Sequence, residues 1–145
     1  MTRYFDTSAL VKYFHKESGS DVVVSLIHEP ACISCISELA GLEFKSALYR
    51  RFRNRELTAA QLDTALEKFL LAEKNFRVIS VDSLIISRAE LILRKYGRDK
   101  GLRTLDAIHI ATFLHNEEKS WRFVVSDRHL NSIAEAIGIN TISVV

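Results

Sequence analysis

Four acidic residues of the 145-residue chain stand at comparable places, each just after a strand-like segment or in the first turns of a helix-like one. They are Asp6, Glu43, Asp106 and Asp127. In an open parallel sheet, side chains beyond the carboxyl ends of the strands converge on one cleft. Carboxylates that close together destabilise the fold unless a cation neutralises them. Oxygen ligands without a thiolate or imidazole cluster favour Mg²⁺ or Mn²⁺ over zinc.

The chemistry that such a site supports is hydrolysis of a phosphodiester. Mg²⁺ retains water ligands and suits phosphate substrates. One ion can orient and deprotonate a water, and a second can stabilise the leaving oxygen. Taken singly, most of the acids have a simpler explanation, because Asp6 and Asp127 could cap helices and Asp106 could complement a helix dipole. Glu43 is harder to explain, since no Lys or Arg stands three or four residues from it.

Strand-like and helix-like segments alternate along the chain. This predicts βαβ units, a mainly parallel sheet and helices on both of its faces. The expected strands are short and continuously apolar, as buried parallel strands are; they cover residues 3–5, 31–35, 78–81, 123–125 and 141–144. The expected helices cover residues 9–16, 20–27, 37–53, 58–76, 83–96, 104–114 and 127–137. Gly97 is expected to end the fifth helix, and residues 98–102 to form a charged loop.

The composition predicts one globular domain spanning residues 1–145. The chain is 48% hydrophobic and 26% charged, and no linker or repeat divides it. Twenty basic and 18 acidic residues leave a formal charge of +2, so a nucleic-acid surface would have to come from local clustering. No apolar run is long enough to span a bilayer and no signal peptide is evident, so we expect a cytoplasmic protein without membrane contact.

The two cysteines, Cys32 and Cys35, form a C-x-x-C pair. A zinc site would need a second Cys/His pair at matching spacing, and none is evident. We therefore expect two reduced, packed thiols rather than a metal or redox site.

Four stretches of the sequence resemble the PIN-domain family, and within it the VapC-like toxins of type II toxin–antitoxin systems. They are residues 4–11 (YFDTSALV), 37–48 (SELAGLEFKSAL), 105–112 (LDAIHIAT) and 123–128 (FVVSDR). Any one of these motifs is weak. Their order and spacing, however, fit the family across nearly the whole chain.

The resemblance implies a three-layer α/β/α fold and Mg²⁺- or Mn²⁺-dependent endoribonuclease activity on RNA. It also implies a homodimer that a cognate antitoxin protein inhibits. The four acids described above match the family's acidic quartet, which binds the metal and carries catalysis. Ser8 matches a hydroxyl position near the metal, and Ser126 stands where the family often has Thr or Ser.

Further polar residues lie near these motifs. His109 follows Asp106 by three residues on the same helix face. It could contact a phosphate near the metal, but we favour a residue that borders the core and orients its neighbour. Two basic clusters, in residues 50–55 and 94–103, could hold an RNA backbone or could be solvated helix ends, and both interpretations stay open. Arg103 is the best candidate for an RNA contact, because it stands one turn before Asp106.

Other functions are compatible with a sheet of this type. A non-catalytic PIN-like module that binds RNA or a protein usually lacks one or two of the acids, and titration with Mn²⁺ would identify it, since a scaffold need bind no metal. A phosphatase of the haloacid type needs an Asp-x-Asp after its first strand, where this chain has Asp6-Thr7-Ser8. A receiver domain needs paired acids and a late lysine, and neither is evident.

Overall fold

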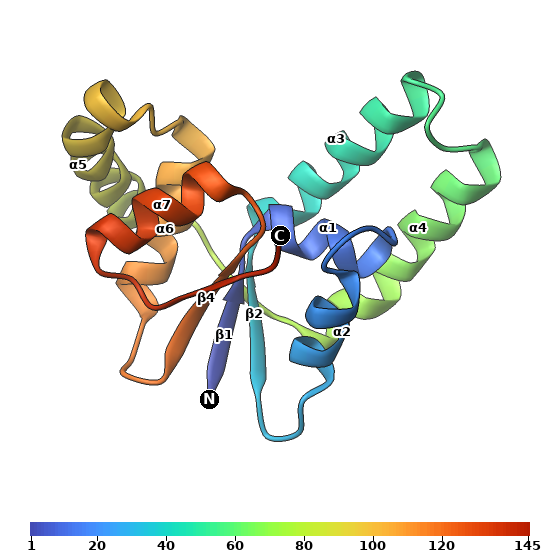
Figure 1. The fold of residues 1–145 in the computed structure, drawn as a ribbon, viewed down its shortest axis with the longest axis horizontal. Helices are drawn as coiled ribbons and strands as arrows, with labels where there is room; N and C mark the ends of the chain where they lie inside the picture. The colour runs from blue at the N-terminus through green and yellow to red at the C-terminus, as the bar shows by residue number, and fades with distance from the viewer.

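A five-stranded parallel sheet forms the centre of the computed structural model, which describes residues 1–145 (Figure 1). Its strands are β1 (Thr2–Phe5), β2 (Ile33–Ser37), β3 (Arg77–Ile79), β4 (Trp121–Val125) and β5 (Thr141–Ser143). Their order is β3-β2-β1-β4-β5, and every neighbouring pair is parallel. The chain moves outward from β1 through β2 and β3, then crosses to the other side of β1 for β4. β1 and β4 therefore flank the switch point, where ligands bind in sheets of this kind.

Helices cover both faces of the sheet, which confirms the predicted three-layer arrangement (Figure 1). On one face lie α1 (Thr7–Phe14), α2 (Ser20–His28), α3 (Leu39–Arg53), α4 (Ala59–Ala72) and the 3-10 turn η1 (Glu73–Asn75). On the other lie α5 (Ser83–Lys100), α6 (Thr104–Asn116) and α7 (Arg128–Ile137). α3 and α4 form a two-helix arm that extends away from the sheet. None of the helices combines the length and the apolar character that crossing a membrane requires.

The side chains of the central strands alternate between two hydrophobic cores. Tyr4 and Phe123 belong to the core beneath α5, α6 and α7, whereas Phe5 and Val124 belong to the core beneath α1 to α4. All four residues of β1 are buried, as expected for a strand covered on both faces. Asp6 directly follows β1 and therefore lies at the centre of the sheet's carboxyl edge.

The end of α5 differs from the prediction. The helix continues through Gly97 to Lys100, and Gly101 ends it with a left-handed φ of 68°. The N–H of Gly101 bonds to the carbonyl of Gly97, and that of Leu102 bonds to the carbonyl of Tyr96, the pattern of a glycine-terminated helix. The predicted cap at Gly97 and the predicted loop at residues 98–100 are therefore wrong.

Other element boundaries shift by a few residues. β2 begins at Ile33 rather than at residue 31, because Ala31 takes a positive φ of 62° in the preceding turn. α1 ends at Phe14, β3 ends at Ile79, and α4 ends at Ala72 with η1 in place of its predicted last turn. These shifts leave the carboxyl edge of the sheet as predicted.

Both cysteines are free thiols. Cys35 is buried on β2, and burial raises the pKa of its thiol to about 11. Cys32 precedes the strand and is only partly buried, so the prediction of a packed thiol is confirmed for Cys35 alone.

Candidate functional site

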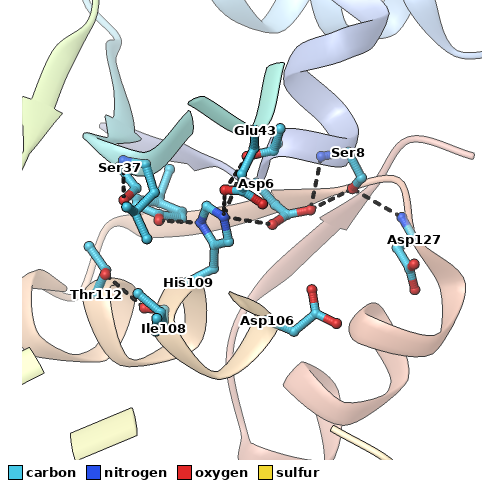
Figure 2. Close-up of polar contacts among 12 residues, drawn as sticks. Asp6, Ser8, Ser37, Glu43, Asp106, Ile108, His109, Thr112 and Asp127 are labelled. Carbon is cyan, nitrogen blue, oxygen red and sulfur yellow. Dashed lines mark hydrogen bonds and ion pairs between the residues drawn. The ribbon is translucent and has the colours of Figure 1, made fainter. Parts of the chain in front are cut away.

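A pocket of about 630 Å³ opens at the carboxyl edge of the sheet, beside the switch point. The β1–α1 junction, α3, the start of α6 and the β4–α7 junction all contribute to its lining. The structure thus brings together the four acids from separate parts of the chain, Asp6, Glu43, Asp106 and Asp127 (Figure 2).

Asp6 directly follows β1 and caps α1 with one of its two carboxylate oxygens. Its Oδ2 accepts hydrogen bonds from the backbone N–H of Ser8 at 3.1 Å and from the Ser8 hydroxyl at 2.6 Å. The Ser8 hydroxyl accepts in turn from the N–H of Ser126 at 3.1 Å. It also accepts from the N–H of Asp127 at 3.2 Å (Figure 2). Ser8 therefore ties the end of β1 to the end of β4. Ser126 takes part through its backbone, and its side chain is not part of the pocket lining.

Asp127 and Asp106 stand on the α6–α7 side of the pocket. Asp127 caps α7, where its Oδ1 accepts from the N–H of Leu130 at 2.8 Å. Asp106 projects from the first turn of α6 toward the side where Asp6 lies (Figure 2). Burial raises the pKa of Asp106, the charges of Asp6 and Asp127 raise it further, and Arg103 opposes them. The carboxylates are therefore close enough to repel one another.

Glu43, on α3, is held by hydrogen bonds from other elements. His109 Nε2 lies 2.6 Å from Glu43 Oε1, and the Thr7 hydroxyl donates to the same oxygen at 2.9 Å. The second ring nitrogen of His109, Nδ1, lies 2.7 Å from the Tyr4 hydroxyl. Both ring nitrogens of His109 therefore have a hydrogen-bond partner: Nε2–H donates to the Glu43 carboxylate, and Nδ1 bonds to the Tyr4 hydroxyl, which can donate or accept. These contacts explain why Glu43 needs no basic neighbour on its own helix.

His109 is 1% exposed and lies on the core side of α6. Burial by itself lowers its pKa, but the charge of Asp6 and the hydrogen bond and charge of Glu43 outweigh burial, so the pKa is raised. Its Nε2 also lies 3.7 Å from Asp6 Oδ1. His109 therefore orients Glu43 and faces Asp6. It forms hydrogen bonds with Glu43 and Tyr4 rather than with Asp106, so the residue that it orients comes from another helix.

Arg103 precedes α6 with a side chain that is 75% exposed. Its Nε lies 3.4 Å from Asp106 Oδ2, and its Nη2 lies 4.0 Å from Asp127 Oδ2. The guanidinium thus offsets part of the repulsion between these two acids. Exposed ion pairs of this kind stabilise a fold by less than about 1 kcal/mol, so a ligand can displace Arg103 at little expense.

The donor set of the pocket fits a small, hard cation. Each of the four carboxylates keeps one oxygen that forms no hydrogen bond within the chain. No three His, Cys, Asp or Glu side chains are gathered closely enough to enclose an ion by themselves. Mg²⁺ does not need such a cage, because it binds one or two carboxylates directly and keeps several waters. Spaced carboxylate oxygens around a pocket match that requirement.

Sequence reasoning missed three residues of this site. Tyr4 looked like a core residue of an apolar strand, and nothing in the sequence links it to His109. Thr7 directly follows Asp6 in the sequence, and this adjacency could have identified its hydroxyl as part of the site. Glu17 also lines the pocket, but it lies after α1 in a turn without a recognisable motif.

Comparison with known proteins identifies the class to which this fold and site belong. The family model described as PIN domain matches residues 3–136. The chain therefore belongs to the PIN domain family. Among its relatives, Ribonuclease VapC45 from Mycobacterium tuberculosis is 31% identical over 138 residues, which cover 93% of this chain and 90% of that protein. The predicted resemblance to PIN-domain and VapC-like proteins is confirmed.

Solved structures of low sequence identity share the same fold. VapC20 from Mycobacterium tuberculosis, described as a sarcin-ricin loop cleaving toxin, superposes with a TM-score of 0.71 at 15% identity, covering 97% of this chain and 98% of that one. A toxin–antitoxin complex from Klebsiella pneumoniae gives a TM-score of 0.60 at 19% identity, covering 86% of each chain. These similarities confirm the predicted PIN-like architecture.

Proposed function

We propose that this chain is a Mg²⁺- or Mn²⁺-dependent endoribonuclease and the toxin of a VapBC-type toxin–antitoxin pair. The observation that carries the proposal is the convergence of four carboxylates, each with an oxygen that forms no hydrogen bond, in one pocket at the switch point of a PIN-domain sheet. The names of its relatives, a ribonuclease and a sarcin-ricin loop cleaving toxin, support the same reaction class.

The four carboxylates would hold the ion or ions. Bound there, a divalent ion would supply the positive charge that activates a water and neutralises the phosphodiester. The rest of the chain positions these ligands, since His109 and Thr7 hold Glu43 and Ser8 holds Asp6. In-line attack by water on phosphorus should leave products with 5′-phosphate and 3′-hydroxyl ends.

The proposal includes the partners of the protein. The toxin–antitoxin complex among the structural neighbours supports a cognate antitoxin protein as a partner of this chain. In this proposal residues 1–145 act as one PIN domain, two copies form a homodimer, and the protein works in the cytoplasm on an RNA substrate.

The Asp6→Asn variant tests the proposal most directly. Asn keeps an acceptor for the N-cap of α1, so we expect an unchanged circular dichroism spectrum and a cooperative thermal transition. Cleavage of labelled RNA with Mn²⁺ should fall by at least about a hundredfold, because the charge that holds the ion is lost. The Asp63→Asn variant is a matched control, since Asp63 is exposed on α4, away from the pocket. Undiminished cleavage by Asp6→Asn would refute the assignment.

Isothermal titration with Mn²⁺ separates this function from a non-catalytic module. The wild-type protein should bind Mn²⁺, and the Asp6→Asn variant should bind it more weakly. Addition of a chelator should stop RNA cleavage, and excess Mn²⁺ should restore it. A protein that binds no Mn²⁺ and cuts no RNA would be a scaffold.

A further inference from the structure

The arginine-rich end of α3 is divided by the fold into two groups. Arg50 and Arg51 line the acidic pocket. Arg53 and Arg55 line a separate hollow at the turn between α3 and α4. A cluster that looks uniform in the sequence therefore has two different surroundings, and only the first pair shares a pocket with the four acids.

One face of α3 forms a continuous wall of this pocket. The wall runs from Glu43 through Ser46 and Ala47 to Arg50, at the three- and four-residue spacing of one helix face. The rise of an α-helix places Arg50 about 10 Å from Glu43 along the axis. Because the side chains of Ser46 and Ala47 are small, they leave room for a nucleic-acid strand along the helix between Glu43 and Arg50.

The positive charge of Arg50, unlike that of its neighbour Arg51, has no acidic partner within the chain. Arg50 is exposed and forms no ion pair or side-chain hydrogen bond within the chain. The guanidinium of Arg51 is partly buried and lies 3.6 Å from Glu17, which also lies 3.8 Å from Lys12. Side chains on a helix lean toward its N-terminus, which for Arg50 is the direction of Glu43. A free positive charge therefore stands in the pocket, at a distance from the acids.

We infer that Arg50 binds a backbone phosphate of the RNA close to the bond that is cleaved, and that the RNA strand runs along α3 from Glu43 toward Arg50. The inference rests on the proposed function. Of the three arginines that line the pocket, Arg51 is paired with an acid, and Arg103 on the opposite wall is engaged by two. A guanidinium suits this task because its planar donors can bind two phosphate oxygens at once. Such a contact positions the strand without reading its bases.

Fluorescence anisotropy with a short fluorescein-labelled single-stranded RNA tests the inference. The Asp6→Asn background prevents cleavage during the measurement. We expect Arg50→Ala to weaken RNA binding about tenfold and to reduce the slope of log Kd against log salt by about 0.7. Arg51→Ala should weaken binding less, because Glu17 already pairs with that charge. Arg53→Ala is the matched control, exposed on the same helix but outside the pocket, and should change Kd by less than about twofold.

A second measurement locates the contact on the RNA. It uses an RNA that the wild-type protein cuts at one site, with one phosphate at a time replaced by an uncharged methylphosphonate. At one position near the cut, the substitution should weaken binding as much as Arg50→Ala does. The two changes together should weaken it no further, because both remove the same contact. Losses that add at every position would overturn the inference.

The outcomes separate this inference from the proposed function. Equal RNA binding by the Arg50→Ala and Arg53→Ala variants overturns the inference, even where the wild-type protein cleaves RNA. Loss of affinity for a protein partner, with RNA affinity unchanged, overturns it as well and assigns Arg50 to that partner. Failure of the wild-type protein to cleave any RNA with Mg²⁺ or Mn²⁺ overturns the proposed function itself.

Discussion

The two halves of the acidic pocket are held in different ways. In the hydrogen-bonded half, Asp6 and Glu43 accept hydrogen bonds from hydroxyl, backbone N–H and imidazole donors of neighbouring elements. In the ion-paired half, Asp106 and Asp127 face the pocket beside the exposed guanidinium of Arg103. Both halves line the same pocket, so they differ only in the interactions that hold their carboxylates in place.

The two halves therefore differ in how firmly their carboxylates are held before a ligand binds. The donors behind Glu43 are themselves buried, since His109 is 1% exposed and Tyr4 is fully buried. Displacing Glu43 would leave buried polar groups without partners, at about 1–3 kcal/mol for each. Displacing Asp106 breaks an exposed ion pair, which stabilises by less than about 1 kcal/mol. The hydrogen-bonded half is therefore pre-organised, and the ion-paired half is free to adjust around an incoming ligand.

The His109→Ala variant should have the largest effect on stability. It removes a buried side chain and leaves the Tyr4 hydroxyl and Glu43 without their shared partner. We expect the free energy of unfolding, measured by urea denaturation, to fall by about 2–4 kcal/mol. The control in the ion-paired half is Arg103→Ala, for which we expect a change of less than about 1 kcal/mol. Similar losses for the two variants would erase the distinction between the halves.

The Tyr4→Phe variant sharpens the comparison by removing a single hydroxyl. The ring would still stack on Phe123, with centroids 5.6 Å apart, but Nδ1 of His109 would lose its hydrogen-bond partner. We expect a loss of about 1–2 kcal/mol in unfolding free energy. Affinity for Mn²⁺, measured by isothermal titration, should fall by up to about tenfold, because Glu43 is no longer held in one orientation. An unchanged Mn²⁺ affinity would limit Tyr4 to a role in stability.

The Asp106→Asn variant should have the smallest effect, with the opposite sign. Burial and the charge of Asp6 raise the pKa of Asp106 in the folded state. A carboxyl with a raised pKa begins to destabilise the fold as pH rises above its ordinary pKa, and does so fully above its folded-state pKa. With a chelator at neutral pH, the variant should therefore melt slightly above the wild type, and the gain should vanish in acid.

Calorimetry with and without metal completes this test. In excess Mn²⁺ the order of melting temperatures should reverse, because the wild type gains more binding energy from the ion than Asp106→Asn does. If Asp106→Asn melted below the wild type in chelator, repulsion between the carboxylates of the ion-paired half would not be destabilising the fold.

Some features of the acidic pocket could be predicted from the sequence, and others could not. Asp6 and Asp127 follow apolar runs that read as strands, so the parallel sheet and the shared pocket could be predicted. The capping interpretation and the pocket interpretation are compatible, since each carboxylate caps a helix with one oxygen and leaves the other without a hydrogen bond. The hydrogen bonds of Glu43 could not be predicted. Its partners, Thr7 and His109, come from other elements, and their positions depend on how α1 and α6 pack.

The local sequence pattern also left helix ends, strand ends and the orientation of α3 undetermined, because these depend on tertiary packing. Gly97 follows the last apolar residue of the helical pattern, whereas Gly101 follows three charged residues, and the tertiary structure selects Gly101 as the residue with positive φ. Helical periodicity places Arg50 and Arg51 on the face of Glu43, but the assembled sheet determines that this face lines the pocket. Burial on both sides gives the central strands β1 and β4 their runs of apolar residues, whereas the exact ends of strands depend on turns such as the one at Ala31.

The pairing of β1 with β4 joins segments from nearly opposite ends of the chain, with Thr2 opposite Trp121. During synthesis β1 emerges before β4 and lacks this neighbour until β4 has followed. Contacts so distant along a chain form late and slowly. Asp127 follows β4 by two residues, so the last acid of the pocket arrives with it. A nascent chain therefore acquires its complete acidic pocket only after β4 has been synthesised and has paired with β1.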